Sequence, residues 1–385
     1  MTSANAFDPA RLDGPAARAG ALLTVDLDAA VANYRRLCRE LDGVPCAAVV
    51  KADGYGLGVH RVAPALAAAG AHSFFVATID EGLELRRVLT DGGWPAAEIH
   101  VLNGPLPGTE RELRDARLIP VLNSLQDVAL WTAAGRAEGV RLPAALHVDS
   151  GMSRLGLPDD EVARLAADWS LLDGVQIQLT MTHLSSADAP AHPENAAQLE
   201  RFRSALARLP RTPVCMANSS GVFLGPDYHF DLGRPGVALY GVNPTPAQAN
   251  PMRRVVTLKG RILQVRQIDA GRGVGYGATF RAAGPTRIAT VAAGYADGLL
   301  RHLSNQGRVA IGDRLAPVVG RVSMDSITVD VTALPSDAVR PGDFVDLIGE
   351  HHDQDAMATE AGTIGYEVLT SLGRRYHRAY LGGNG

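Results

Sequence analysis

Between residues 46 and 232 the sequence alternates short apolar runs with stretches that carry apolar residues at helical spacing, and this alternation restricts the possible folds. Parallel strands need crossover connections, which are usually helices. Eight strand and helix units predict a (β/α)₈ TIM-like barrel, whose functional residues lie at the carboxyl ends of the strands. The expected strands are 46–50, 73–77, 99–102, 119–122, 145–148, 176–181, 214–217 and 228–232, and the expected helices include 61–69, 81–89, 125–138, 160–169 and 194–209.

The segments on either side have other patterns. Residues 1–21 are rich in Ala, Pro, Gly and Arg without a sustained period, which predicts a flexible N-terminal arm. A first strand follows at 22–25, then a helix capped by Asp26 or Asp28. After about Gly241 the alternation ends and β patterns dominate. We therefore expect an arm at 1–21, a (β/α)₈ barrel domain at 22–243 and a mostly β C-terminal domain at 244–385, with strands at 255–268, 286–292, 308–311, 316–319, 326–331 and 344–348 and one helix at 357–372.

Charge and composition argue against several classes of function. The net charge is −4 and no Lys/Arg cluster stands out, so binding to nucleic acid or to an acidic membrane is disfavoured. No apolar run has the length of a membrane span and residues 1–20 contain no apolar signal region, which predicts a cytoplasmic protein. The three cysteines, Cys38, Cys46 and Cys215, lack metal-ligand spacing and are expected to be reduced core residues, so no metal site is predicted.

Lys51 stands directly after the first predicted barrel strand, in a loop with glycines at 54, 56 and 58. Lysine is rarely buried unless it is paired or used chemically, so this residue is a candidate Schiff-base amine. A surface lysine at a strand end is the alternative.

Other polar residues recur at the same ends of the predicted strands. Ser219 follows the seventh strand, and together with the Gly236 and Val237 amides it forms a candidate phosphate cradle. Each residue also has an ordinary interpretation: Ser219 as a helix cap, His183 as a core histidine, and Arg154 and Arg234 as exposed loop residues. A lysine, a phosphate cradle and one or two arginines in a barrel mouth favour pyridoxal phosphate, although a phosphosugar aldolase would need the same parts. The strand-end residues are Lys51, Tyr55, His147, Asp149, Arg154, His183, Asn218, Ser219, Arg234, Gly236 and Val237.

The run Val-Val-Lys-Ala-Asp-Gly-Tyr-Gly-Leu-Gly at 49–58 resembles the pyridoxal-lysine signature of the alanine racemases. The resemblance extends from about Leu22 to Tyr380, and several separate blocks in the family's order make it specific. The further blocks are 149–156, 182–183, 217–219, 234–241, 275–279, 294–298 and 320–325.

This resemblance implies a homodimeric two-base racemase that makes D-alanine for peptidoglycan. Lys51 would hold pyridoxal 5'-phosphate and handle the α-proton of D-alanine, and Tyr276, donated by the partner subunit, would handle that of L-alanine. Arg154 would anchor the cofactor's phenolic oxygen and the substrate carboxylate, which the Met324 amide would also contact, and Tyr295 would narrow the entry. Arg234 would bind the pyridine nitrogen with support from His183, and Tyr55, Asn218, Ser219, Gly236 and Val237 would complete the cofactor site.

The chemistry of such a pair can be argued from the residues alone. Moving a proton between the two faces of an α-carbon needs an electron sink and two acid/base groups on opposite sides. Lysine and tyrosine both have ordinary pKa values of about 10, so the site must lower them. An arginine beside the pyridine nitrogen keeps its proton, which weakens the electron sink and limits transamination.

Two positions depart from the family pattern. Many relatives carry a carbamylated lysine seven residues before the loop arginine, whereas this chain has His147, so Arg154 must be held by neutral His147, Asp149, a bound anion or water. Arg374 stands where relatives often have a phosphate-contacting tyrosine. The functional alternatives are a racemase of wider substrate range and a noncatalytic protein that binds pyridoxal phosphate.

Overall fold

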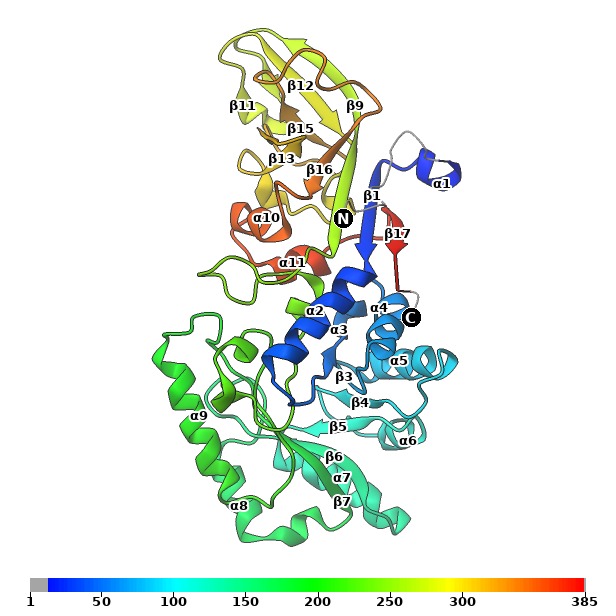
Figure 1. Cartoon of the computed structure of the whole chain (residues 1–385), viewed down its shortest axis with the longest axis vertical. Helices are drawn as coiled ribbons and strands as arrows, with labels where there is room; N and C mark the ends of the chain where they lie inside the picture. Colours follow the sequence, from blue (N-terminus) through cyan, green and yellow to red (C-terminus); the bar gives the residue numbers. More distant parts are fainter. Residues whose placement is uncertain (1–12, 384–385) are drawn as a thin grey trace. The chain divides into compact units, whose positions relative to one another are not determined.

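A computed structural model describes residues 13–383, which divide into two compact units. The barrel unit comprises Leu27–Arg253 with Gly383, and the β unit comprises residues 13–26 and 254–382. Figure 1 traces the chain through both.

A seven-stranded parallel sheet forms the barrel unit, and its strands pair in sequence order from β2 to β8. Helices cross from one strand to the next, as parallel pairing requires. Together with the β unit, this sheet confirms the predicted class, a TIM-like barrel followed by a mostly β domain. The strands are β2 (Ala48–Val49), β3 (Ser73–Val76), β4 (Glu98–Val101), β5 (Ile119–Leu122), β6 (Leu142–His147), β7 (Val175–Met181) and β8 (Val214–Cys215). The helices are α2 (Leu27–Glu40), α3 (Lys51–Tyr55), α4 (Val59–Ala68), α5 (Ile79–Asp91), α6 (Glu110–Asp115), α7 (Leu125–Glu138), α8 (Asp159–Ala167) and α9 (Pro193–Leu206), with 3₁₀ turns η2 (Trp169–Leu172), η3 (Gly221–Phe223), η4 (Pro226–Tyr228) and η5 (Val237–Tyr240).

The expected eighth strand, 228–232, is wrong. Residues 226–228 form the 3₁₀ turn η4. The barrel is closed by residues 231–235, here called the closing segment, which form no continuous ladder of strand hydrogen bonds. It lies between β8 and β2 because Asp231 N donates to Val214 O at 2.9 Å and Ala47 N donates to Gly233 O at 2.8 Å. Pro235 cannot donate a backbone hydrogen bond, so the segment closes the barrel through scattered contacts and a single bridge, Cys46 to Gly233.

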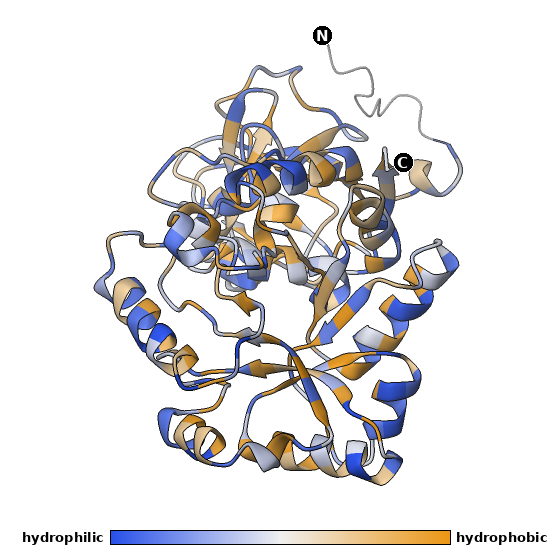
Figure 2. Ribbon diagram, turned by 60° about the horizontal axis from the view of Figure 1, so that its bottom comes forward, coloured by the Kyte–Doolittle hydropathy of each residue, from blue (hydrophilic) through white to orange (hydrophobic). Residues whose placement is uncertain are grey.

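Local sequence signals account for the longer helices. Ser124 caps the start of α7 by accepting a hydrogen bond from Asp127 N, and Gly139 ends the helix in the left-handed conformation. The barrel helices carry both hydrophilic and hydrophobic residues along their length (Figure 2), so that one face of each can pack on the apolar strands. Among residues 13–383, no helix is both long and apolar enough to span a membrane.

The β unit centres on an eight-stranded sheet in which β14, β13, β16, β9, β1 and β17 pair in that order and β12 pairs with β9 and β15. Its apolar core includes Val274, Ile288 and Val319. The strands are β1 (Ala21–Asp26), β9 (Val256–Ile268), β12 (Thr286–Val291), β13 (Arg308–Ile311), β14 (Arg314–Pro317), β15 (Ile327–Asp330), β16 (Phe344–Ile348) and β17 (His377–Leu381), and β10 (Gly273–Val274) pairs with β11 (Phe280–Arg281). The helices are α1 (Gly14–Ala17), α10 (Gln354–Glu360) and α11 (Gly365–Thr370), with 3₁₀ turns η6 (Tyr276–Ala278), η7 (Tyr295–Asp297) and η8 (Arg301–Leu303).

Three details of this unit differ from the expectations. The strand expected at 22–25 is present as β1, but it pairs with β9 and β17 instead of joining the barrel sheet (Figure 1). The single helix expected at 357–372 is two helices, because Gly362 is left-handed and Ile364 is extended between them. Of the expected arm, residues 1–12 lie outside the described residues, 14–17 form α1 and Ala21 already begins β1.

Gly135 offers a test of barrel packing. Alanine normally stabilises a helix interior relative to glycine by about 1 kcal/mol, but a Cβ at Gly135 would lie 2.1 Å from Gly174 O. We expect Gly135→Ala to lower the free energy of unfolding by roughly 1–3 kcal/mol in urea titrations. Gly82→Ala in α5 is the control, because its Cβ would meet side-chain atoms of Leu118 and Val101 and no backbone atom among its nearest neighbours. Wild-type stability in Gly135→Ala would contradict this packing.

Candidate functional site

Val50 separates Lys51 from the end of β2, and Lys51 begins a turn with unusual backbone geometry. Ala52, Asp53 and Tyr55 have positive φ angles of 54°, 54° and 55°, and Gly54 and Gly56 have 63° and 80°. Each non-glycine residue in this left-handed region costs roughly 1–2 kcal/mol. Such strain persists only where the surroundings fix the conformation, and it is concentrated at functional sites.

Hydrogen bonds fix this turn at both ends. Gly54 N donates to Val50 O at 2.9 Å and Gly56 N donates to Ala52 O at 2.7 Å. Ala52 N donates to Glu81 Oε1, and Val59 N donates to Asp53 Oδ1, each at 2.7 Å. The turn therefore sets the direction of Lys51 and of Tyr55, whose buried ring stacks on Tyr240 with centroids 4.7 Å apart.

The environment of the Lys51 amine favours its neutral form. Burial lowers the pKa of Lys51, and the Arg154 and Arg234 guanidiniums lower it further, whereas the Glu81 carboxylate raises it. A lysine with a lowered pKa can act as a nucleophile or a base near neutral pH.

Arg234 is buried and almost fully engaged with the chain. Its Nη2 donates to Thr182 O at 2.9 Å, and both terminal nitrogens lie 3.3 Å from His183 Nδ1. Because arginine can only donate, His183 Nδ1 accepts, and burial together with Arg234 lowers the pKa of His183 well below its usual range. Arg234 Nε is buried without a protein partner, so one donor remains for an acceptor such as a ring nitrogen.

Ser219 and the chain after Arg234 form a small cradle. Ser219 Oγ accepts hydrogen bonds from Gly236 N at 2.9 Å and from Ala238 N at 3.2 Å. A Cβ at Gly236 would lie 2.3 Å from the Tyr55 hydroxyl, so only glycine permits this approach. Val237 is buried beside it. Asn218 uses its side chain within the protein, because Oδ1 accepts from Gly221 N and Nδ2 donates to Leu184 O.

Arg154 lies in a loop that is held by its backbone. Asp149 Oδ1 accepts hydrogen bonds from the amides of Gly151, Met152 and Ser153 at 2.9–3.1 Å. The exposed Arg154 side chain forms no hydrogen bond or ion pair with the residues from 13 to 383.

His147 does not contact that guanidinium; its Nδ1 pairs with Asn123 Oδ1 at 2.8 Å. Asn123 already donates its amide hydrogens to Leu102 O and Val121 O, so its oxygen accepts and His147 Nδ1 carries the proton. Burial, more than the nearby arginines, lowers the pKa of His147 to about 4. The ring is therefore neutral at pH 7, with its Nε2 lone pair available as an acceptor.

The other predicted site residues lie in the β unit. Tyr276, Tyr295 and Met324 are 71%, 44% and 52% exposed, which is unusual for large side chains with apolar surface. Their loops are tied together: Tyr295 N donates to Ser323 O, Asn305 bonds to both Thr279 and Gly320, and Arg375 pairs with Asp297 and Asp325. Arg374 is exposed and forms no hydrogen bond or ion pair in the described chain.

Two residues that contact predicted parts of the site were missed in the sequence: Glu81 contacts the Lys51 turn and Asn123 contacts His147. Glu81 is visible only as part of a capping box with Thr78, and nothing in the pattern shows its contact with Ala52. Asn123 directly follows β5, so the search for polar residues at strand ends could have found it.

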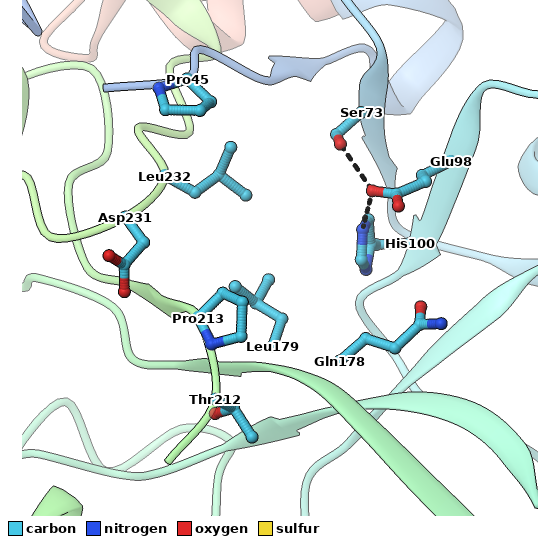
Figure 3. Close-up of a pocket in the computed structure, with 10 residues that line it drawn as sticks. All are labelled: Pro45, Ser73, Glu98, His100, Gln178, Leu179, Thr212, Pro213, Asp231 and Leu232. Atoms are coloured by element: carbon cyan, nitrogen blue, oxygen red, sulfur yellow. Dashed lines mark hydrogen bonds and ion pairs between the residues drawn. The ribbon is translucent and has the colours of Figure 1, made fainter. Parts of the chain in front are cut away.

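A pocket of about 530 Å³ lies at the opposite end of the strands (Figure 3). Ser73 and Glu98 on its wall are the first residues of β3 and β4. Ser73 Oγ donates to Glu98 Oε2 at 2.7 Å, and His100 Nε2, 3.7 Å from the same oxygen, is the main cause that lowers the pKa of Glu98 to about 2. Since Lys51 follows the carboxyl end of β2, this pocket is separate from the candidate site.

Comparison with known proteins gives consistent matches along the chain. A family model described as the N-terminal domain of alanine racemase matches residues 25–244, and one described as its C-terminal domain matches residues 255–380. A catabolic alanine racemase of Mesorhizobium japonicum is 52% identical over 95% of each chain, and an alanine racemase of Rhodospirillum rubrum is 52% identical over 95% of this chain and 97% of its own. The crystal structure of alanine racemase from Bartonella henselae with covalently bound pyridoxal phosphate has a TM-score of 0.90 and 42% identity, covering 94% of this chain and all of that one.

The neutral state of His147 predicts how stability depends on pH. A pKa of about 4 in the folded state lies below the unfolded value near 6.5, so the unfolded chain binds more protons between these pH values. This destabilising contribution is absent above pH 6.5 and amounts to about 2 kcal/mol at pH 5. When the pH is lowered from 7 to 5, the free energy of unfolding falls in wild type. We expect this fall to be about 2 kcal/mol smaller in His147→Gln, which lacks the titrating ring.

Urea titrations at the two pH values measure this difference. His351→Gln is the control, because His351 is exposed in the β unit. A pH dependence in His147→Gln equal to that of wild type would show that the ring is protonated in the folded state.

Proposed function

Because the chain belongs to the alanine racemase family, we propose that it is a pyridoxal-phosphate enzyme that interconverts L-alanine and D-alanine by a two-base mechanism. One observation carries the proposal: Lys51 projects from a strained turn whose neighbours are the buried Arg234, with its unpaired Nε, and the Ser219 cradle. These parts answer the three needs of that cofactor, an amine, a partner for the ring nitrogen and a phosphate anchor.

The residues present fit the cofactor. The orphaned Arg234 Nε is a donor suited to a ring nitrogen, and the Ser219 hydroxyl with the amides after Gly236 suits a phosphate. Tyr55 completes the cradle because Gly236 leaves room for its hydroxyl. When bound, pyridoxal phosphate supplies the electron sink for charge that develops on the α-carbon.

The protein's own contribution is to orient the substrate and to move the proton. Arg154, free of protein partners, binds the substrate carboxylate, with the Met324 amide as a second donor. The Lys51 amine removes or returns the α-proton on the face used by D-alanine, and the Tyr276 hydroxyl does so on the face used by L-alanine. Arg234 keeps its charge beside the ring nitrogen and His183 holds its orientation. Arg154 is held through its loop, whose backbone amides donate to Asp149 Oδ1, and not by His147.

We further propose that the active unit is a homodimer in which Tyr276 reaches the site of the partner subunit. The exposure of Tyr276, Tyr295 and Met324 on loops that are tied together supports this, since exposed clusters of this kind mark interaction surfaces. The physiological role proposed is the supply of D-alanine for peptidoglycan in the cytoplasm. The Mesorhizobium relative is named a catabolic alanine racemase, so a role in alanine breakdown is the alternative.

A single assay tests the activity and its alternatives. The protein is loaded with pyridoxal phosphate and incubated in heavy water with L-alanine, L-lysine or L-arginine, and both optical inversion and α-deuterium uptake are followed. Inversion and exchange of alanine, with much slower turnover of the basic amino acids, is the expected result. Equal rates on all three would favour a racemase of wider range, and no exchange at all would favour a noncatalytic binding protein.

Tyr276→Phe tests the assignment of the two bases. We expect α-deuterium exchange of L-alanine to fall roughly 100-fold or more, because a general acid/base group contributes that much, while exchange of D-alanine falls far less. Tyr366→Phe, in α11, serves as the matched control. Equal losses in both directions for Tyr276→Phe would count against the assignment.

A further inference from the structure

Glu81 links three segments of the chain around Lys51. It is the third residue of α5, and its Oε2 accepts hydrogen bonds from Ala77 N at 2.7 Å and Thr78 N at 3.3 Å. A capping box requires of its glutamate only the hydrogen bond from the N-cap amide, here Thr78 N. Its second oxygen, Oε1, reaches outside the helix and accepts from Ala52 N at 2.7 Å.

The contact to Ala52 falls on the peptide bond that joins it to Lys51. Ala52 is the first left-handed residue of the strained turn, so its amide direction determines whether the chain enters that turn. A hydrogen bond to a charged acceptor is stronger than one between neutral groups, so this contact offsets part of the strain of the left-handed residues. Glu81 therefore ties the Lys51 peptide to the end of β3 and the start of α5.

Glu81 also supplies negative charge to a site dominated by cations. The charged and titratable groups that face Lys51 are Glu81 from α5, Arg154 from the loop after β6, Arg234 from the closing segment and the neutral His183 after β7. Of the groups that affect the amine, only the Glu81 carboxylate favours its protonated form.

We propose that Glu81 is a positioning residue for Lys51, which locks the Lys51–Ala52 peptide into the left-handed turn and places one negative charge against the two arginines. This inference rests on the proposed role of the Lys51 amine. Glu81 touches neither substrate nor cofactor in this assignment and acts through the backbone and the charge of the site.

The chain allows a direct measurement because it contains only two lysines, Lys51 and Lys259. Lys259 pairs with Asp346 in the β unit and serves as an internal reference. The full-length chain, freed of cofactor, is labelled with limiting acetic anhydride over a range of pH, and labelling of each lysine is read by peptide mass spectrometry. The variants are Glu81→Gln and Glu81→Ala. The control is Glu84→Gln, because Glu84 is exposed and lies about one helical turn after Glu81 in α5.

In wild type we expect Lys51 to become reactive at lower pH than Lys259. Glu81→Gln and Glu81→Ala shift the Lys51 midpoint further down, while the Lys259 midpoint and the whole Glu84→Gln profile stay unchanged. A helix cap with no link to Lys51 would lower the melting temperature without moving this midpoint. Identical Lys51 midpoints in wild type and both Glu81 variants would overturn the charge assignment.

Capture of pyridoxal phosphate by the same cofactor-free proteins tests the positioning. We expect Glu81→Ala to weaken capture roughly tenfold or more, as loss of a charge-assisted hydrogen bond predicts, and Glu81→Gln to fall between it and wild type, because an amide offers one acceptor in place of two. Wild-type capture by both Glu81 variants would overturn the positioning role alone. Failure of wild type itself to capture the cofactor would instead contradict the proposed function, and the acetylation profiles would still report on Glu81.

Discussion

The left-handed turn from Ala52 to Gly56 is the constraint on which the rest of the candidate site depends. Three of its five residues carry side chains that disfavour this conformation. The barrel strand before it, the Glu81 carboxylate and the Asp53 cap on Val59 offset that strain. As a result, one short segment aims Lys51 at the end of the barrel and places the Tyr55 hydroxyl where Gly236 makes room for it.

The distribution of basic residues gives the site its chemistry. The chain has two lysines and 35 arginines, and one of the two lysines stands directly before the left-handed residues of this turn. Arginine keeps its proton at any working pH, so Arg154 and Arg234 remain positively charged. Lysine can release its proton when buried beside other cations, and Lys51 is in that position. The Lys51 amine, which can exchange a proton, thus lies near the guanidiniums of Arg154 and Arg234, which keep theirs.

Much of this arrangement could be predicted from the sequence, because barrel strands are short apolar runs and their carboxyl ends share one edge. That logic placed Lys51, His183, Ser219 and Arg234 in the same region. The closing segment 231–235 could not be predicted, since its pairing comes from isolated backbone contacts around Gly233 and Pro235 with no apolar period. The location of β1 was missed because a short, mostly apolar strand does not reveal its partners, which here lie more than two hundred residues away. The contact between Glu81 and Ala52 likewise depends on tertiary geometry that a capping pattern does not encode.

The central claim, that Lys51 is the amine that carries the cofactor, has one direct test. The protein is loaded with pyridoxal phosphate, reduced with borohydride to make the link permanent, digested and analysed by mass spectrometry. With only Lys51, Lys259 and the N-terminal amine available in the chain, the account predicts one pyridoxyl group per chain, on the peptide that contains Lys51. A label on Lys259 or the N-terminus, or none after reduction, would contradict it.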